Sequence, residues 1–531
     1  MPRAIAPGRS CLECRRRKIK CDRSRPCSYC VKVRLQCKYP ARPLPNEDAL
    51  TRVASLETKL GAMEKRLSGL TEPRQSTAGP AASGRRSHES RKAEHPLQSP
   101  PKNVSALLKP QPNIDIESLR PAAPMVAVLW QRYLDVVDPL IKIFHTPTVQ
   151  KLVVKAIHGR TKLNRASHCL LFAIYYAAVA AMSREDCENE LEEDRRVLLK
   201  RYGVAVTYCL SHQNLLECRN MTVLQAFSIY LITARCDEDG PDVYSLVGVA
   251  AGIALKMDLN KDGAALRLSP FETEMRRRLW WQLLILDTRV AEDRDSEPCI
   301  LESSFNTQLP SNVADADLHP QMSRPPVSAQ GRTEMFFSLT RFETSYFARQ
   351  LVFSDEFSRD NEYAHMSGDQ KRAAIDCFQD RIEKQYLSQR DDKIPLDNVL
   401  VKSVRLVLAK IKLMITDPTP MEDETEEEKL LKMQGWIEVL HEAEALRRYE
   451  EGTQWLWLFQ TYIEWDALTE LLLLLRIQTL GVSEQHAWNI AEAVYSYWKS
   501  VATTRHDHRW QRIERLRQEA LALRDELLAD T

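Results

Sequence analysis

Six of the chain's 13 cysteines lie within residues 11–37, where their spacing suits metal binding. The pattern Cys-x2-Cys-x6-Cys occurs twice in this segment, in two copies offset by 16 residues. A Cys-x2-Cys pair can offer two thiolates to one metal ion, and structural zinc takes four ligands in a tetrahedron. Because the segment contains no histidine, sulfur must supply these ligands. The six candidate ligands are Cys11, Cys14, Cys21, Cys27, Cys30 and Cys37.

The number of cysteines indicates how the metal would be shared. Two separate tetrahedral sites need eight ligands, and six thiolates suffice only if two of them bridge both metals. The internal repeat makes Cys11 and Cys27 equivalent, so this pair is expected to bridge two zinc ions. The alternative is one zinc held by the two Cys-x2-Cys pairs, which would leave Cys21 and Cys37 free. In either case, metal binding of about 10 kcal/mol or more would supply the folding free energy of so small a segment.

The residues between the cysteines are strongly basic in the first half of the repeat only. Five of the six residues of "RRRKIK" are cationic, whereas the equivalent stretch "VKVRLQ" has two cations. Lysine and arginine contact guanine edges and phosphates, so the first half is the one suited to nucleic acid. A nuclear-import signal or a solvated surface would explain the same run. The residues concerned are Arg15, Arg16, Arg17, Lys18 and Lys20.

These motifs resemble the fungal binuclear zinc-cluster transcription factors. The resemblance rests on the six cysteine positions, on "CRRRKIKCD", and on Pro26 in the loop that joins the two halves. It implies that each half forms a short helix and an extended piece around two zinc ions, and that the first helix enters the DNA major groove. Lys18 would then read guanine in a CGG-like triplet, while Arg15, Lys20 and the arginines between Arg15 and Lys18 would contact phosphates.

Charge and composition separate this head from the rest of the chain. Residues 1–42 hold 13 Lys/Arg and two acids, a net charge of +11, which leaves 61 basic and 71 acidic residues, or −10, for the remainder. A basic head on an acidic body is typical of a protein that binds a polyanion. The other seven cysteines are scattered, which indicates a reducing, intracellular compartment. The sequence shows no signal peptide or apolar stretch long enough for a bilayer, so no membrane partner is expected.

Residues 46–70 predict a coiled coil. Apolar residues recur at alternating intervals of four and three from Ala49, and a short parallel two-stranded coil fits this pattern. Basic residues at the g positions and acidic residues at the e positions would attract each other between the two chains of a homodimer. The alternative is an amphipathic helix that packs on its own domain, although neighbouring sequence offers no core for it. The expected dimerisation residues are Val53, Leu56, Leu60, Met63, Leu67 and Leu70.

The remaining chain divides into a linker and one large domain. Residues 71–124 contain nine of the 27 prolines and no Phe, Tyr or Trp, which predicts a disordered linker. Residues 125–531 hold all ten tryptophans and show helical rather than strand periodicity, which predicts an all-helical domain in two halves around a loop near 310–332. The Trp-rich segment 452–475 is expected in its core.

One stretch of the large domain is especially informative. Ser269 and Pro270 suit the cap and first position of a helix whose apolar face includes Leu279 and Leu283. Here "RRRLWW" and the acidic loop "LPSNVADADL" resemble the family's all-helical middle regulatory domain. The three arginines of that run, Arg276–Arg278, are expected to neutralise acids such as Asp287 or Glu292.

The expected fold is therefore mainly α, with a zinc-organised head at 1–45, a coiled coil, a linker and an all-helical regulatory domain. The expected function is that of a nuclear, sequence-specific transcription factor that binds double-stranded DNA as a homodimer and acts with the transcription machinery. The resemblance extends this to control of a metabolic or secondary-metabolite pathway. Alternatives are a metal-stabilised protein-interaction module and an enzyme with an accessory zinc module. Against the enzyme, the body shows no phosphate-binding glycine loop, nucleophile elbow or two-histidine zinc motif.

Overall fold

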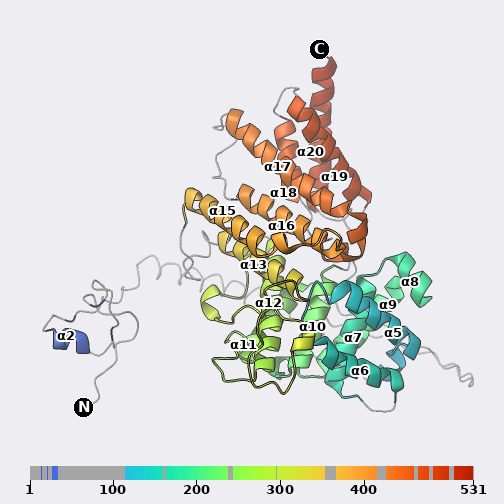
Figure 1. Cartoon of the computed structure of the whole chain (residues 1–531). Coiled ribbons are helices and arrows are strands. Elements are labelled where there is room, and N and C mark those ends of the chain that lie inside the picture. The colour runs from blue at the N-terminus through green and yellow to red at the C-terminus, as the bar shows by residue number, and fades with distance from the viewer. Residues whose placement is uncertain are drawn as a thin grey trace, which may run out of the picture. The chain divides into compact units, whose positions relative to one another are not determined.

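The computed structural model describes one small region near the N-terminus and most of the chain from residue 114 onward (Figure 1). By internal contacts the chain separates into two units, residues 1–93 and 94–531. The residues described are 14, 21, 27–33, 37, 114–159, 163–236, 243–294, 296–352, 366–414, 426–459, 465–476, 482–500 and 508–529. Throughout these residues the regular structure is helical and no strand occurs, which confirms the mainly α fold.

The second unit begins earlier than the sequence predicts. Asp115 caps a short helix, η1 (Ile116–Leu119), by accepting a hydrogen bond from the backbone N–H of Glu117. Leu119 of this helix is buried against the domain core. The helical domain therefore includes residues 114–124, which the sequence assigns to the disordered linker, and the expected boundary at 124 differs from the observed one. The rest of the expected linker lies outside the described residues.

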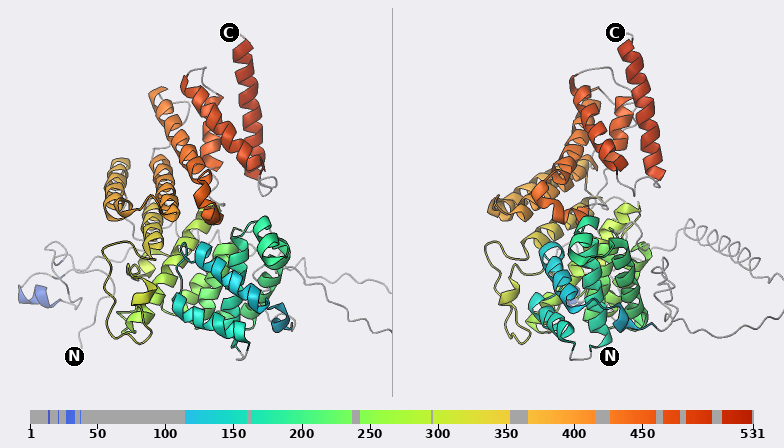
Figure 2. Two further views of the ribbon diagram at one scale, coloured as in Figure 1. Left: turned by 45° about the vertical axis from the view of Figure 1, so that its right-hand side comes forward. Right: turned by 90° about the vertical axis from the view of Figure 1, so that its right-hand side faces the viewer.

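The first helices of this unit surround three that are buried on nearly all sides. Almost every residue of α7 and α10 is buried, and so are two thirds of the residues of α12, as expected for central helices of a large core. In Figure 2 these helices stay clustered in both views. The helices are α5 (Ala123–Arg132), η2 (Tyr133–Val137, a π-helix), α6 (Thr146–His158), α7 (Arg165–Ala180), α8 (Arg184–Leu191), α9 (Arg195–Ser211), η3 (Leu215–Glu217), α10 (Met221–Ala234), α11 (Val243–Lys256) and α12 (Pro270–Asp293).

An irregular segment with only two short helices leads from α12 to the second group of helices, shown from yellow to red in Figure 1. Here α16 packs on α13 and α17, and α18 packs on α17, α19 and α20. The elements are η4 (Glu302–Ser304), η5 (Asp315–Asp317), α13 (Phe336–Val352), α15 (Gly368–Gln385), η6 (Leu387–Gln389), α16 (Pro395–Met414), α17 (Glu426–Arg447), η7 (Glu450–Phe459), α18 (Trp465–Leu475), α19 (Val482–Ser500) and α20 (His508–Ala529).

One buried apolar cluster connects both groups of helices. It includes residues on both sides of the 310–332 loop, from Leu119 to Ala520, while Val313 and Leu318 of that loop form a separate small cluster with Met275. Trp455, Trp457 and Trp465 of the Trp-rich segment belong to it, as the sequence predicts. No single described helix is long and apolar enough to cross a membrane, and one bent pair, α7 with α8, meets that test only in combination.

Candidate metal centre and regulatory domain

The described cysteines of the head gather in one cluster. Cys14, Cys27 and Cys30 are fully buried, and their sulfur atoms lie within 4.8 Å of one another. Cys21 and Cys37 pack against these three. The sequence pattern thus brings cysteines from both halves of the repeat into contact, and Cys11 lies outside the described residues.

Cys27 occupies the position where the two halves meet. Its sulfur lies 3.6 Å from that of Cys14, which belongs to the first half. The same sulfur accepts a 3.5 Å hydrogen bond from the backbone N–H of Cys30 in the second half. The backbone N–H of Cys27 in turn donates to the sulfur of Cys37 at 3.3 Å. The helix α2 (Ser28–Lys32) begins directly after Cys27 and fixes the separation of Cys27 and Cys30 at one turn.

This arrangement fits zinc. With Zn–S bonds of about 2.3 Å, two sulfurs on one tetrahedral zinc lie about 3.8 Å apart, close to the Cys14–Cys27 separation. The backbone N–H groups on sulfur offset negative charge that metal-bound thiolates carry. The cluster therefore has the donor set and spacing of a zinc site, and zinc bound there would hold the segment folded.

The predicted DNA-binding and dimerisation residues lie outside the part of the chain that the structure describes. Arg15, Arg16, Arg17, Lys18 and Lys20 lie outside the described residues. The whole segment 46–70 also lies outside them, and with it the predicted coiled-coil residues Val53, Leu56, Leu60, Met63, Leu67 and Leu70.

The start of α12 in the large domain confirms the sequence prediction. Ser269 is the N-cap, and its hydroxyl accepts a 3.1 Å hydrogen bond from the backbone N–H of Glu272. Pro270 takes the first helical position. The predicted apolar residues Leu279 and Leu283 are buried, although the helix is buried well beyond that one face.

The partners predicted for Arg276–Arg278 are wrong. Arg276 pairs with Glu272 and Arg277 with Asp262, while fully buried Arg278 pairs with Glu274 and Asp315. The predicted acids have other partners: Asp287 pairs with Arg349 and Glu292 with Arg289. Asp287 is nine residues after Arg278, more than two helical turns away, whereas Glu274 is one turn away on the same face.

A buried ionic network was not predicted from the sequence. Arg278 approaches Asp315 of η5 at 2.6 Å, and Asp315 also lies 3.2 Å from the ammonium group of Lys142. Lys142 makes a second ion pair, at 2.6 Å, with Asp138 directly after η2. Burial alone would raise the pKa of Asp315, but the charges of Arg278 and Lys142 lower this pKa to about 2. The network ties the irregular segment to α12 and to the chain after η2.

A second buried pair anchors the same irregular segment nearer its start. Both carboxylate oxygens of Asp287 accept hydrogen bonds of 2.9 Å from the backbone N–H groups of Cys299 and Ile300. Arg349 of α13 reaches Asp287 and the carbonyl of Ile300. The acidic loop "VADADL" contains Asp315 of the first network, but nothing in the sequence indicated the partners of Asp287, because Arg349 is 62 residues away along the chain.

A cysteine cluster with zinc geometry and an all-helical body are the two parts expected of a fungal zinc-cluster transcription regulator. Residues 9–45 match the fungal Zn(2)-Cys(6) binuclear cluster domain, and residues 130–359 match the fungal specific transcription factor domain. The chain belongs to this family, whose members are DNA-binding regulators rather than enzymes. Helices from α15 onward follow the second match but share its buried core.

Curated relatives extend the similarity over most of the chain. The aurofusarin cluster transcription factor aurR2 of Gibberella zeae is 27% identical over 95% of this chain and 78% of its own length. The transcriptional regulator AacuB of Aspergillus aculeatus is 26% identical over 76% of this chain. The pyriculol/pyriculariol biosynthesis cluster transcription factor 1 of Pyricularia oryzae is 30% identical over 73% of it. The chain covers 66% and 53% of the last two relatives' lengths.

Proposed function

We propose that the chain is a sequence-specific DNA-binding transcription factor whose head holds two zinc ions and reads CGG-like triplets. The observation that carries this proposal is the position of Cys27, whose sulfur adjoins cysteines of both halves of the repeat. A sulfur in that position suits a thiolate shared by two metals. The contacts of Cys21 and Cys37 with the same cluster favour six ligands over a four-cysteine site.

The basic residues divide into a base-reading residue and phosphate-binding residues. In this proposal Lys18 donates to the O6 and N7 atoms of guanine in the major groove. Arg15, Lys20 and the two arginines between Arg15 and Lys18 contact phosphates, which supply affinity without base preference. The second half of the head, with two cations between its last cysteines, serves mainly to complete the metal site.

The coiled coil at 46–70 pairs two heads, so the factor binds two half-sites as a parallel homodimer. Its helical body, residues 114–531, passes the regulatory signal to the transcription machinery in the nucleus. Two of the relatives carry the names of biosynthetic gene clusters, which supports the proposal that this chain controls a secondary-metabolite cluster.

DNA binding by the full chain tests the proposal directly. Fluorescence anisotropy should show specific binding to duplexes that carry two CGG half-sites, with a preferred spacing within a graded series, and weaker binding when the triplets are scrambled. A mismatch in a half-site should cost about 1–3 kcal/mol. Equal affinity for intact and scrambled duplexes would contradict sequence reading, and binding to neither would favour the protein-interaction module.

A further inference from the structure

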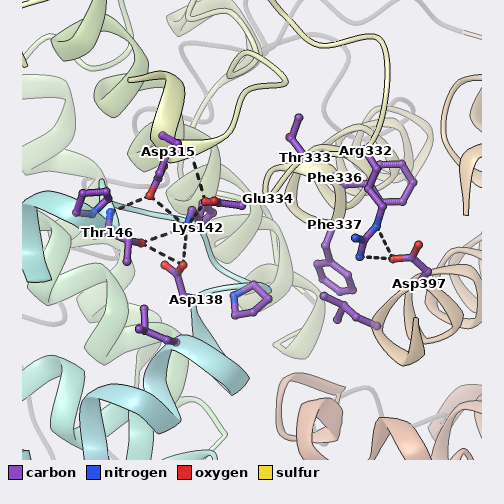
Figure 3. Close-up of a pocket in the computed structure, with 15 residues that line it drawn as sticks. Asp138, Lys142, Thr146, Asp315, Arg332, Thr333, Glu334, Phe336, Phe337 and Asp397 are labelled. Atoms are coloured by element: carbon purple, nitrogen blue, oxygen red, sulfur yellow. Dashed lines mark hydrogen bonds and ion pairs between the residues drawn. The ribbon is translucent and has the colours of Figure 1, made fainter. Parts of the chain in front are cut away.

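The regulatory domain contains a pocket of about 500 Å³ that the proposed DNA-binding function does not use. Its walls come from η2 and the chain after it, from the irregular segment before α13, and from the starts of α6, α13 and α16. A pocket of this size lies within the range of sites that hold small organic molecules. Figure 3 shows the side chains that line it.

One side of the pocket is ionic. Lys142 contacts Asp138 at 2.6 Å, Glu334 at 2.9 Å and Asp315 at 3.2 Å, and it donates to the hydroxyl of Thr146 at 3.1 Å (Figure 3). An ammonium group has three N–H donors, so these neighbours leave it none for an added anion.

The carboxylates of the lining outnumber its cations. Arg332 directs its Nε and one Nη to Asp397 of α16, at 3.0 and 2.7 Å. Lys142 and Arg332 therefore face Asp138, Asp315, Glu334 and Asp397, so the charged lining residues sum to −2.

Asp138 is the lining residue that most clearly indicates a ligand-binding site. It is 5% exposed, and its Oδ2 atom accepts from Lys142 and Thr146. Its Oδ1 atom has no hydrogen-bond partner within the described part of the chain. A buried carboxylate oxygen without a partner is costly, and burial raises the pKa of Asp138 although the Lys142 charge opposes this. The π-helix η2 immediately precedes Asp138, and such irregular turns frequently occur at functional sites.

The pocket also has apolar lining residues. Phe336 and Phe337, at the start of α13, are almost fully buried and line it together with Leu134, Pro139 and Leu396. The Arg332–Asp397 ion pair lies on the same side as these rings (Figure 3), with the Arg332 guanidinium 5.9 Å from the centre of the Phe336 ring. Aromatic and aliphatic lining near an acceptor suits a ligand with an apolar body and one donor group. Aromatic rings also attract cations.

We propose that this pocket binds a small organic cation, a protonated amine with an apolar body, whose N–H groups donate to Asp138 Oδ1 and whose body packs on Phe336 and Phe337. Anionic ligands are disfavoured, because the N–H donors of Lys142 are already used and the lining has more carboxylates than cations. Because Asp138 follows η2 and the two phenylalanines belong to α13, a bound amine contacts both groups of helices of the regulatory domain. Binding of an amine at this site does not depend on which DNA bases the head recognises.

The test uses the full chain and three matched probes: phenethylamine, the neutral phenethyl alcohol and the anionic phenylacetate. Saturation-transfer NMR detects binding, and titration of tryptophan fluorescence gives the affinity. The amine should bind with a dissociation constant on the order of 1 mM or tighter, as a ligand of this size allows. The alcohol should bind more weakly and phenylacetate should bind least.

Two variants and one control locate the site. Asp138→Asn keeps the shape of the side chain and should weaken amine binding roughly tenfold or more, because a charge-assisted hydrogen bond is lost. Ala316→Trp fills the pocket from an exposed lining position and should abolish binding without disturbing the ion pairs. Asp369→Asn removes an exposed carboxylate on α15 and should leave the affinity unchanged.

Three results would overturn the proposal. They are no binding of phenethylamine at millimolar concentration, equal binding of all three probes, or unchanged amine affinity in folded Ala316→Trp protein. The last readout holds even if Asp138→Asn fails to fold. Since the probes are measured without DNA, failure here leaves the proposed DNA-binding function intact, and failure of CGG recognition leaves this site intact.

Discussion

The side chain of Cys27 combines a structural and a positional role. It is the N-cap of α2, so the backbone N–H of Cys30 points at its sulfur, while the sulfur of Cys14 approaches from the other half of the repeat. The sequence repeat predicts Cys27 and Cys11 as the two shared sulfurs; the position of Cys27 beside Cys14 and Cys30 agrees with this, and Cys11 lies outside the described residues.

Variants of the basic residues beside the cluster should distinguish the residue that reads bases from those that contact phosphates. Lys18→Ala should cost about 1–3 kcal/mol at the CGG site and reduce the preference over scrambled duplex, because a direct base contact is lost. Arg15→Ala should weaken binding to all sequences alike and lower the slope of log affinity against log salt by about one. Anisotropy titrations at several salt concentrations measure both. Identical behaviour of the two variants would contradict the division of roles.

Asp315 should make the regulatory domain sensitive to acid. Its pKa is about 2 in the folded protein, well below the unfolded value of about 3.9, so the folded state favours the ionised form. The stabilisation is therefore fully present above about pH 4 and is lost as the pH falls toward 2. Between these limits the stability difference between wild type and Asp315→Asn should shrink by about 2–3 kcal/mol.

Tryptophan fluorescence in denaturant, at a series of pH values, measures this difference for the regulatory domain alone, since all ten tryptophans lie there. A stability difference that stays constant from pH 7 to below pH 4 would mean that Asp315 is not held ionised by Arg278 and Lys142.

The residues around α12 show what local sequence can and cannot predict. Ser269 and Pro270 were assigned correctly because capping depends on the next three residues. The partners of Arg278 were not, since Asp315 is 37 residues away and reaches it only through the path of the irregular segment. The pocket beside Lys142 is also formed by residues far apart in the sequence, so no local sequence pattern predicted it.

At the scale of elements, the π-helix η2 joins distant parts of the regulatory domain. The indole N–H groups of Trp455 and Trp457 in η7 donate to the carbonyls of Asp135 and Val136, at 3.1 and 3.3 Å. A π-helix shifts the backbone hydrogen bonds, and these indoles satisfy carbonyls in the shifted turn. The sequence predicted that these tryptophans would be buried, but not which element they contact.

The proposed coiled coil is an element whose charges can be tested. In the proposed register Glu57 and Glu64 occupy e positions and face Arg52 and Lys59 at the g positions of the partner chain. Replacing both glutamates by Lys therefore leaves only basic residues in these pairs. Exposed pairs are worth about 0.5 kcal/mol and each occurs twice in a dimer, so association should weaken by about 2 kcal/mol, roughly thirtyfold. Sedimentation equilibrium of the full chain measures this constant.

Mixing that variant with a chain carrying Arg52→Glu and Lys59→Glu restores attraction and should recover dimers that contain one of each. Unchanged homodimer strength in the Glu57 and Glu64 variant would contradict a parallel coil in this register and favour a helix that packs on its own domain.

At the scale of the whole molecule, the head and the regulatory domain are stabilised by different means. Among the described residues of the head, the buried cluster consists of cysteines with Tyr29 beside them, so we expect the head to depend on metal, whereas one large apolar cluster holds the body together. Composition predicted this division, since the basic cysteine segment and the tryptophan-rich body differ so clearly. Composition placed the start of the body after η1, because it cannot show that Leu119 of η1 contacts the core.

Metal removal should therefore affect the two parts unequally. Chelation of zinc should abolish binding to CGG duplexes, while the tryptophan-detected unfolding transition of the body should keep its midpoint. Restoring zinc should recover DNA binding. Loss of the tryptophan transition on chelation would show that the body depends on the metal, and retained sequence-specific binding would show that the head does not.

The zinc content of the purified full chain tests the shared-sulfur cluster most directly. Native mass spectrometry, which resolves the metal bound to each chain, should find two zinc ions per chain. The Cys27→Ser variant should retain fewer than one zinc ion per chain on average, because the Cys27 sulfur is shared by both ions. A single zinc in the wild-type chain, with Cys21 and Cys37 reactive toward a thiol reagent, would contradict the account.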